Sequence, residues 1–404
     1  MTSYLLKGGI ITTYTKENVP RAFKADVLVE GSVITAVGED LLSPAGVQVI
    51  NCQGRWIAPG MVDTHRYDMI LTRIQLPSNP ATRALPSPEF AKEEETIKWQ
   101  IEKLKEWGAR DGGKLSADGR VTLGLAYDVF APGSMEPHRE FLKFARSIPV
   151  SIITAHVRGG AGPRICIYRD GGLLGPDIVL SHCNELYHHT EPDDEMWGIM
   201  KEYNCGIAST PVDELGMAHG NPTAFEAVER GVKCGLGVDA TSINSGDLFT
   251  QMRFALQFWR GRQHEKVLKE GLTPPQYNKF KSADAFRLAT LGGAECLNMS
   301  HLIGTIEVGK KADIVIFDAT STNLAGAVDP FNGIVFHASN ADVETVFVNG
   351  EIVKRDGKLT KVEWGPVAKE LQEKAEQLQK KWPAEKLDEI WSQWYSTIGG
   401  KLQF

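Results

Sequence analysis

The sequence predicts an α/β fold, an incomplete (β/α) barrel with a composite β-sandwich formed by both chain ends and a C-terminal helix. Two patterns support this prediction. The middle of the chain repeats an apolar strand followed by a helical stretch, at intervals of about 25 to 30 residues, as in parallel strands joined by helices. Both ends instead alternate short apolar strands with turn residues, which is typical of an antiparallel sheet.

The first fifty residues supply the N-terminal part of the sandwich. Strands are expected at 4–9, 10–12, 25–31 and 33–38, each bounded by turn residues. The same pattern of short apolar strands bounded by turn residues occurs again at 312–318 and 343–353. Strand-rich ends that flank an α/β middle indicate one β module closed by both termini.

The barrel strands follow. The first is expected at 56–62 and leads to His65, and later strands are expected at 121–127, 150–155, 177–181, 205–209 and 233–238. Two more would be needed before residue 121, but this stretch holds a proline-marked loop at 76–86 and a helix at about 89–107. Only 69–76 could form another strand, so we expect six or seven strand units.

The carboxyl end is predicted to be a helical extension. Residues 367–396 are rich in Lys, Glu, Gln and Ala and carry tryptophans at 382, 391 and 394. The apolar positions are expected to pack on the body or on a second subunit, which leaves a homodimer open.

Composition describes an ordinary globular chain of 404 residues, with 42% hydrophobic and 24% charged residues. The net charge is -7 and no basic run exceeds a pair of lysines, so neither nucleic acid nor an anionic membrane is an expected partner. We expect a small-molecule substrate.

The compartment predicted from the sequence is the cytoplasm. The amino terminus has no basic region followed by a long apolar stretch, and no run of about 18 apolar residues occurs elsewhere. The six cysteines have wide, irregular spacings that match neither a disulfide framework nor a C-x-x-C zinc site. We interpret them as mostly buried thiols.

Polar residues stand at the ends of four expected strands. They are His65, His156, His182 and Asp239. The carboxyl ends of parallel strands meet at one rim, and imidazole and carboxylate are ordinary ligands of zinc or iron. A lone histidine is more often a hydrogen-bonded structural residue, but four coincident strand ends favour a metal site. The histidines at 138, 188, 189, 264, 301 and 337 are interpreted as surface residues.

Several segments resemble the metal-dependent amidohydrolase superfamily, in the branch of cytosine deaminases and chlorohydrolases. The stretch "IAPGMVDTHRYD" resembles the family's first strand, and "LSHCNEL", "GVKCGLGVDATSINSGDLFTQMR" and "IGTIEVGKKADIVIFD" resemble later landmarks in the same order. The similarity spans roughly residues 4 to 355. It implies a sandwich of residues 1–55 and 305–360, a catalytic barrel of 56–304 and a helical extension of 361–404.

The resemblance also implies roles for the rim residues. His65, His156 and Asp239 would bind one divalent metal ion, zinc in the first place, with Fe²⁺ or Mn²⁺ as alternatives. Asp239 would also accept the proton of the attacking water, and His182 would orient water or substrate.

The chain departs from the family pattern at three places. Tyr67 occupies the position of a second first-strand histidine, and a neutral phenol is a poor metal ligand. The position three residues after His156, where family deaminases have a glutamate, is Gly159. The third departure is the shortened barrel, which suggests a natural deletion after the first strand, a truncated gene product or a rebuilt barrel.

Four residues are candidates for substrate contact. Glu214 and His219 lie in the polar, turn-rich stretch 209–220, for which a self-capping turn is an equally good interpretation. Arg158 could pair with a substrate carboxylate or with Asp128. Tyr67 is the fourth candidate.

The leading functional hypothesis is a metal-dependent hydrolase of a non-peptide carbon–nitrogen bond in a cyclic amidine, an amide or an amine-bearing small molecule. Two alternatives stay open. One is a metal-poor lyase or isomerase that uses Tyr67 and His182 as acid and base. The other is a catalytically silent binding or dimerising homologue.

Overall fold

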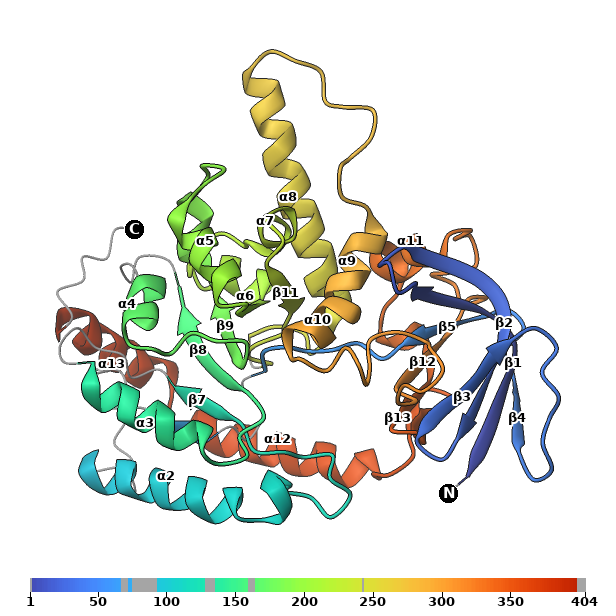
Figure 1. The fold of residues 1–404 in the computed structure, drawn as a ribbon, viewed down its shortest axis with the longest axis horizontal. Coiled ribbons are helices and arrows are strands. Elements are labelled where there is room, and N and C mark those ends of the chain that lie inside the picture. Colours follow the sequence, from blue (N-terminus) through green and yellow to red (C-terminus); the bar gives the residue numbers. More distant parts are fainter. Residues whose placement is uncertain are drawn as a thin grey trace. The chain divides into compact units, whose positions relative to one another are not determined.

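A computed structural model of the chain (Figure 1) describes residues 2–66, 72–74, 93–127, 135–158, 164–241 and 243–397. The chain divides into two compact units. The first comprises Met1–Ile70 and Thr154–Lys358, and the second comprises Leu71–Ile153 and Leu359–Phe404. No helix among the described residues is long and apolar enough to cross a membrane.

A nine-stranded sheet in the first unit is built from both parts of the sequence, as predicted. Its order is β15-β14-β13-β12-β5-β1-β2-β3, with β4 paired to β1. The strands are β1 (Ser3–Tyr14), β2 (Pro20–Glu30), β3 (Val33–Gly38), β4 (Gln48–Asn51), β5 (Arg55–Pro59), β12 (Ile314–Asp318), β13 (Val343–Val348), β14 (Glu351–Arg355) and β15 (Lys358–Leu359). The antiparallel pairing of β12 with β5 joins the late strands to the early ones.

The core of this sheet is aliphatic. Fully buried side chains from early and late strands pack together, among them Leu6, Val27, Ile57, Ile314 and Ile316. Burial of this apolar surface is the main favourable contribution to holding the distant chain segments together.

The first unit also contains four neighbouring parallel strands, β8 (Ile153–Val157), β9 (Ile178–His182), β10 (Gly206–Ser209) and β11 (Lys233–Leu236). The helices α4 (Arg164–Asp170), α5 (Glu195–Glu202), α6 (Pro211–Gly216) and α7 (Ala224–Glu229) connect them, together with the 3₁₀ turn η3 (Asn184–His188). Every residue of β9 and β10 is buried. Strands buried on both faces read as continuous apolar runs, and for that reason the sequence located them closely.

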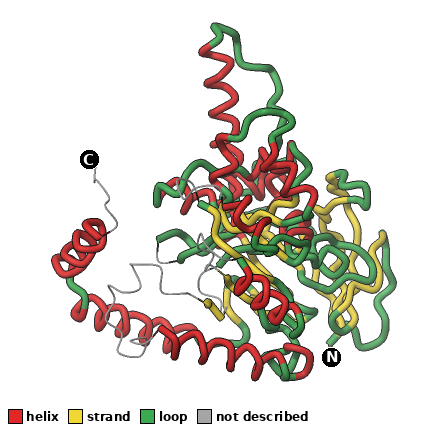
Figure 2. Tube along the Cα trace, turned by 60° about the vertical axis from the view of Figure 1, so that its left-hand side comes forward, coloured by secondary structure: helices red, strands yellow, loops and turns green. Residues whose placement is uncertain are grey.

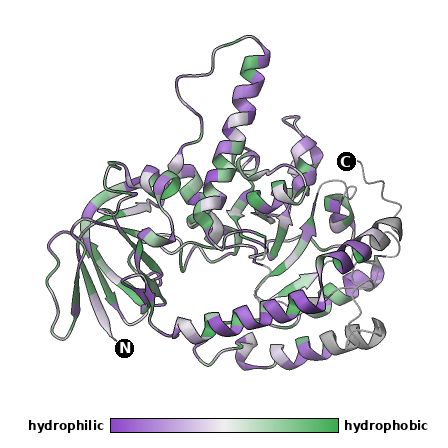
Figure 3. Cartoon of the chain, turned by 180° about the vertical axis from the view of Figure 1, so that it is seen from behind, coloured by the Kyte–Doolittle hydropathy of each residue, from purple (hydrophilic) through white to green (hydrophobic). Residues whose placement is uncertain are grey.

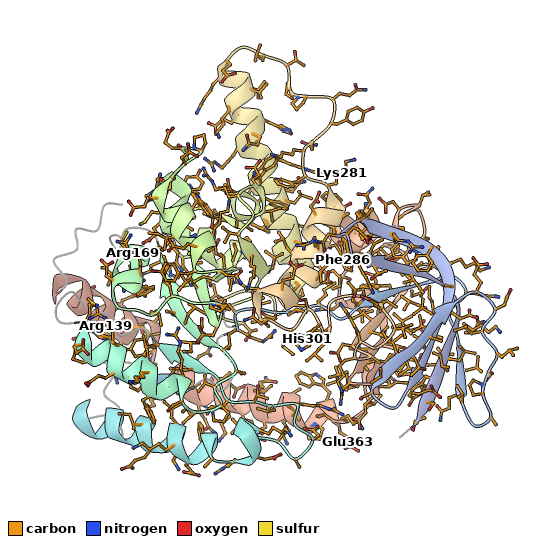
Figure 4. All side chains as sticks on the ribbon, viewed as in Figure 1. Arg139, Arg169, Lys281, Phe286, His301 and Glu363 are labelled. Carbon is orange, nitrogen blue, oxygen red and sulfur yellow. The ribbon has the colours of Figure 1, made fainter. Side chains whose placement is uncertain are left out.

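Further helices follow β11 along the chain. They are α8 (Leu248–Lys269), α9 (Ser282–Leu288), α10 (Leu291–Cys296) and α11 (Pro330–Asn332), with the π-helical turn η4 (Gly333–His337) and the 3₁₀ turn η5 (Asn340–Asp342). Phe286 of α9, labelled in Figure 4, is fully buried and packs against Tyr14 and Phe331 with ring centroids 6.3 and 5.7 Å away. These aromatic contacts join the helices to β1.

The second unit contains the parallel pair β6 (Thr72–Ile74) and β7 (Leu125–Tyr127). Its helices are α2 (Glu93–Gly108), α3 (Glu136–Arg146), α12 (Trp364–Lys381) and α13 (Ala384–Thr397), with the 3₁₀ turn η2 (Asp111–Gly113). The strand expected within 69–76 is therefore present. The strand expected over 121–127 is shorter than predicted, because Leu115 and Val121 pair in a preceding turn. The loop expected at 76–86 lies outside the described residues.

The C-terminal extension is two helices and not one. Figure 2 shows α12 and α13 as separate helices joined by a short turn, and Figure 3 shows hydrophobic residues spaced along the mainly hydrophilic α12. The break falls at Trp382, whose φ of -129° and ψ of 71° are not helical. Pro383 follows, and proline disfavours the helical conformation of the residue before it.

Candidate metal centre

The segment that carries His65 leaves β5 and is tied to the end of β11. The peptide N–H of Thr64 donates to the carbonyl of Leu236 (3.0 Å), and the N–H of Asp239 donates to the carbonyl of His65 (2.8 Å). These bonds fix His65 beside Asp239, although the two residues are far apart in the sequence. The strand expected over 56–62 as the first barrel strand is β5, which ends at Pro59. It pairs with β1 and β12 in the nine-stranded sheet and not with the parallel strands β8 to β11, so this part of the barrel prediction is wrong.

The side chain of Asp63 accepts hydrogen bonds from the same two segments. One carboxylate oxygen accepts hydrogen bonds from the N–H groups of His65 and Val238, both at 3.2 Å. The other accepts from Arg66 at 3.1 Å. Asp63 therefore links the backbone next to both candidate ligands.

The backbone itself is strained at two candidate residues. His182 has a φ of 70° and Asp239 a φ of 62°, which is the left-handed region that side chains other than glycine rarely adopt. Such conformations persist only where surrounding contacts hold them, and they cluster at functional sites. His182 is the last residue of β9, and Asp239 follows β11 along the chain.

The four rim residues meet, as the strand-end argument predicted. Nitrogen atoms of His65, His156 and His182 lie within 4.8 Å of one another, and the carboxylate of Asp239 stands 3.5 Å from His65 Nε2 and 3.7 Å from His182 Nε2. The strands β8, β9 and β11 that lead to this cluster are labelled in Figure 1. His65, His182 and Asp239 are buried, and His156 is partly buried.

The donor set fits a divalent cation. His65 Nε2 is buried and has no hydrogen-bond partner among the described residues. A buried imidazole nitrogen without a partner costs free energy, which a bound ion would recover. Ligand atoms about 2.1 Å from a tetrahedral zinc ion stand about 3.4 Å apart, close to the separation of His65 Nε2 from Asp239 Oδ1.

His182 is held from behind by two residues near α6 (Pro211–Gly216). Its Nδ1 lies 2.9 Å from the Thr210 hydroxyl and 3.7 Å from Glu214 Oε1. Glu214 is fully buried and accepts hydrogen bonds from the N–H of Thr210 (2.7 Å) and the hydroxyl of Ser209 (3.2 Å). The Nε2 of His182 is left to face Asp239.

The pKa values of three neighbouring carboxyl groups are shifted in opposite directions. Burial raises the pKa of Glu214 to about 8. Burial and then the neighbouring Asp239 raise the pKa of Asp213 to about 7. Burial also opposes ionisation of Asp239, but the His65 imidazole 3.5 Å away outweighs it and holds the pKa of Asp239 below its usual range. Asp239 is therefore the ionised member, available to bind a cation.

His219 lies next to this group. Its ring centroid is 5.0 Å from that of His182, in an edge-to-face arrangement, and its Nδ1 is 3.8 Å from Asp213 Oδ2. Burial and then the charge of His182 lower the pKa of His219 to about 4, so its ring is neutral near pH 7.

The other candidates are placed as follows. The stretch around Glu214 was expected to be a polar turn, but it forms the short helix α6, with Pro211 at its first position. Arg158 is exposed just after β8. Tyr67, Asp128 and Gly159 lie outside the described residues. Three histidines interpreted as surface residues are partly exposed and are also hydrogen-bonded, namely His138 to Tyr127, His189 to Asp194 and His264 to Asn278.

Sequence reasoning missed several residues that support the site. They are Asp63, Thr154, Ser181, Thr210 and Asp213. Their positions beside rim residues were the only available signal, because a supporting role depends on contacts between segments distant in the sequence.

Comparison with known proteins gives one family match. The model of the amidohydrolase family matches residues 138–353. Among curated proteins, the 5'-deoxyadenosine deaminase of Methanopyrus kandleri is 30% identical over 208 residues, which cover 51% of this chain and 44% of that protein. The 5-methylthioadenosine/S-adenosylhomocysteine deaminase of Moorella thermoacetica is 29% identical over 275 residues, covering 64% and 58%. The chain thus spans about half the length of the curated relatives it matches.

Solved structures share the fold. A variant of atrazine chlorohydrolase from Arthrobacter aurescens, complexed with zinc and atraton, superimposes with a TM-score of 0.69 at 17% identity, covering 91% of this chain and 98% of that one. An adenosine deaminase from Xanthomonas campestris with bound zinc gives a TM-score of 0.70 at 15% identity, covering 94% and 99%.

Proposed function

Because the chain belongs to the amidohydrolase family, we propose that it is a metal-dependent hydrolase that cleaves a non-peptide carbon–nitrogen bond in a small molecule. The substrate class is a cyclic amidine, an amide or an amine-bearing molecule. The observation that carries the proposal is the cluster of nitrogens from His65, His156 and His182 within 4.8 Å of one another, with the Asp239 carboxylate 3.5 Å from His65 Nε2.

His65, His156 and Asp239 would hold one divalent ion. Zinc is our first choice, since imidazole and carboxylate suit it and two similar folds were solved with zinc. Fe²⁺ and Mn²⁺ are the alternatives. When bound, the ion lowers the pKa of a coordinated water molecule, so that a nucleophile is available near neutral pH.

Asp239 then transfers protons, and His182 orients water or substrate. Asp239, ionised next to His65, accepts a proton from the attacking water and returns it to the departing nitrogen. His182, fixed by Thr210 at Nδ1, presents Nε2 to the same side and orients water or substrate. Water adds to the substrate carbon, the carbon–nitrogen bond breaks and an amine or ammonia leaves.

Four residues are proposed to contact the substrate, namely Tyr67, Arg158, Glu214 and His219. His219 is the best supported, because its ring packs on His182 beside the cluster. Glu214 is fully buried behind His182, so its influence would reach the substrate mainly through that ring. Adenosine-like compounds are the first substrates to try, since the curated relatives are named as deaminases of such compounds.

Two further proposals concern the setting of the enzyme. The six cysteines are free thiols, which supports a reducing compartment such as the cytoplasm. A homodimer is proposed as the assembly, to be measured by light scattering of the full chain.

Metal analysis and turnover test the proposed function together. Protein purified without chelator should contain about one ion per chain, and chelated protein should regain deamination of 5'-deoxyadenosine when zinc or manganese is added. Asp239→Asn should lose this activity by more than about 100-fold, because the proton acceptor is gone. The exposed change Asp193→Asn is the matched control.

The outcomes separate the hypotheses. Metal binding with turnover of this or a related amine supports the hydrolase. A chain that binds no metal, and whose turnover of any substrate is indifferent to Asp239→Asn, is not the proposed enzyme.

A further inference from the structure

Two hydroxyl groups connect the candidate ligand His65 to the neighbouring strands. Ser181 Oγ, on β9, lies 3.0 Å from His65 Nδ1, and Thr154 Oγ1, on β8, lies 3.2 Å from Ser181 Oγ. All three side chains are buried, with exposed fractions of 0% for Ser181, 7% for His65 and 8% for Thr154. Water is therefore a poor substitute for either hydroxyl.

The two nitrogens of His65 face different surroundings. Nδ1 meets Ser181, whereas Nε2 has no hydrogen-bond partner among the described residues and stands 3.5 Å from Asp239. A neutral imidazole carries one proton, and the partner of one nitrogen decides which nitrogen keeps its lone pair. If Nδ1–H donates to Ser181, the Ser181 hydroxyl can in turn donate to Thr154, and Nε2 keeps a lone pair that can bind a cation shared with Asp239.

We propose that Ser181 is a positioning residue that holds His65 in the Nδ1–H form and aims Nε2 at the metal, with Thr154 orienting the Ser181 hydroxyl. This inference rests on the proposed function. It concerns how the site is built, since partners of this kind fix the tautomer and ring orientation of a ligating histidine and raise its basicity.

Holding His65 in place matters more in this chain than it would if the same segment supplied two histidine ligands. The position two residues after His65 is Tyr67, so His65 is the imidazole that this segment contributes. With three candidate ligands, a loosely held His65 would weaken a large part of the coordination. A buried hydroxyl that restricts its rotation therefore compensates in part for the missing second ring.

Zinc affinity of the full chain gives the main test. Ser181→Ala should raise the zinc Kd by about 10- to 100-fold, measured by competition with a chelator. Thr154→Val should raise it in the same direction by a smaller factor, and Thr154→Ser, which keeps the hydroxyl, should restore the wild-type Kd. Ser282→Ala removes another buried serine hydroxyl, bonded to Asn332, and should leave the Kd unchanged.

A spectroscopic readout isolates the tautomer. In zinc-loaded protein labelled with ¹⁵N-histidine, the Nδ1–H signal of His65, assigned by its loss in His65→Gln, should persist in the wild type and broaden or shift in Ser181→Ala. Thermal unfolding of the metal-free variants shows whether each one folds. If Ser181→Ala does not fold, the Thr154→Val and Thr154→Ser pair carries the same comparison.

The results distinguish this inference from the proposed function. Zinc binding by the wild type with an unchanged Kd and Nδ1–H signal in Ser181→Ala overturns the inference alone. Absence of zinc binding in the wild type overturns the proposed function and the inference with it.

Discussion

Gly237 lies directly against the backbone of the candidate ligand His65. A Cβ atom at this position would stand 2.7 Å from the backbone nitrogen and oxygen of His65, which cannot swing aside as a long side chain could. The absence of a side chain therefore lets the segments carrying His65 and Asp239 lie in contact.

Gly237→Ala should consequently damage both stability and the site. Forcing the two segments apart is expected to lower the free energy of unfolding by about 1–3 kcal/mol and to weaken zinc binding. Denaturant unfolding and chelator competition measure the two effects. Gly261→Ala is the control, because Gly261 lies in α8 with no atom within 4 Å of an added Cβ. That substitution should be neutral or stabilising by about 0.4–1 kcal/mol, and equal behaviour of the two variants would contradict the argument.

The rim residues could be predicted, whereas their supports could not. Parallel strands end at a common edge, so His156, His182 and Asp239 could be brought together from strand positions alone. Asp63 and Ser181 form hydrogen bonds to residues on distant segments of the chain. The spacing of apolar residues in the sequence gives no sign of such contacts. The role of each rim residue in catalysis stays a prediction.

At the scale of elements, prediction succeeded where burial leaves a plain signal. The strands expected at 177–181 and 205–209 coincide closely with β9 and β10, which are buried throughout. The helix α6 was missed because six residues are too few to show a helical repeat, although Pro211 at its start is a typical first helical residue. The break between α12 and α13 at Pro383 could have been predicted from the proline itself.

The turn η5, before β13, depends on one buried carboxylate. Asp342 accepts hydrogen bonds from the N–H and hydroxyl of Ser339, from the Ser321 hydroxyl and from the Asn323 amide. Burial opposes its ionisation, but the bonds from Asn323 and Ser321 outweigh burial and lower the pKa of Asp342. The carboxylate thus joins the chain after β12 to the start of β13.

Asp342→Asn should therefore destabilise the protein in a pH-dependent way. A carboxyl group whose pKa is lower in the folded chain stabilises the fold above its unfolded pKa, about 3.9 for aspartate, and this stabilisation disappears as the pH falls through the folded pKa. We expect a loss of about 1.5–3 kcal/mol near neutral pH, because an amide cannot accept all of these bonds. The difference from wild type should shrink in acid, as measured by unfolding across pH. A difference of the same size at every pH, or one matched by Asp193→Asn, would speak against this role.

At the scale of the whole molecule, the sequence indicated the joining of the chain ends in one sheet but not the composition of the second compact unit. Strand patterns at both ends predicted one shared β module, but not that β5, expected as the first barrel strand, would pair with β12 inside it. The grouping of Leu71–Ile153 with the C-terminal residues carries no comparable signal, because helices with polar surfaces do not specify which distant segment they accompany. The domain boundaries expected at 55, 304 and 360 remain predictions.

The residues of the candidate metal site come from three separate parts of the first unit. These parts are the segment after β5, the strand β8 and the segment at the end of β11. Since an ion held by all three binds only the folded arrangement, zinc should stabilise the native state by linkage. The gain is about 2.7 kcal/mol when free zinc is 100 times its Kd. The Tm of the chelated wild type should therefore rise as zinc is added. Asp239→Asn should abolish most of the rise while Asp193→Asn preserves it, since only the first change removes a candidate ligand. The same rise in all three proteins would place the bound zinc elsewhere, on thiols or surface histidines, and would separate the stability of this fold from the His65, His156 and Asp239 cluster.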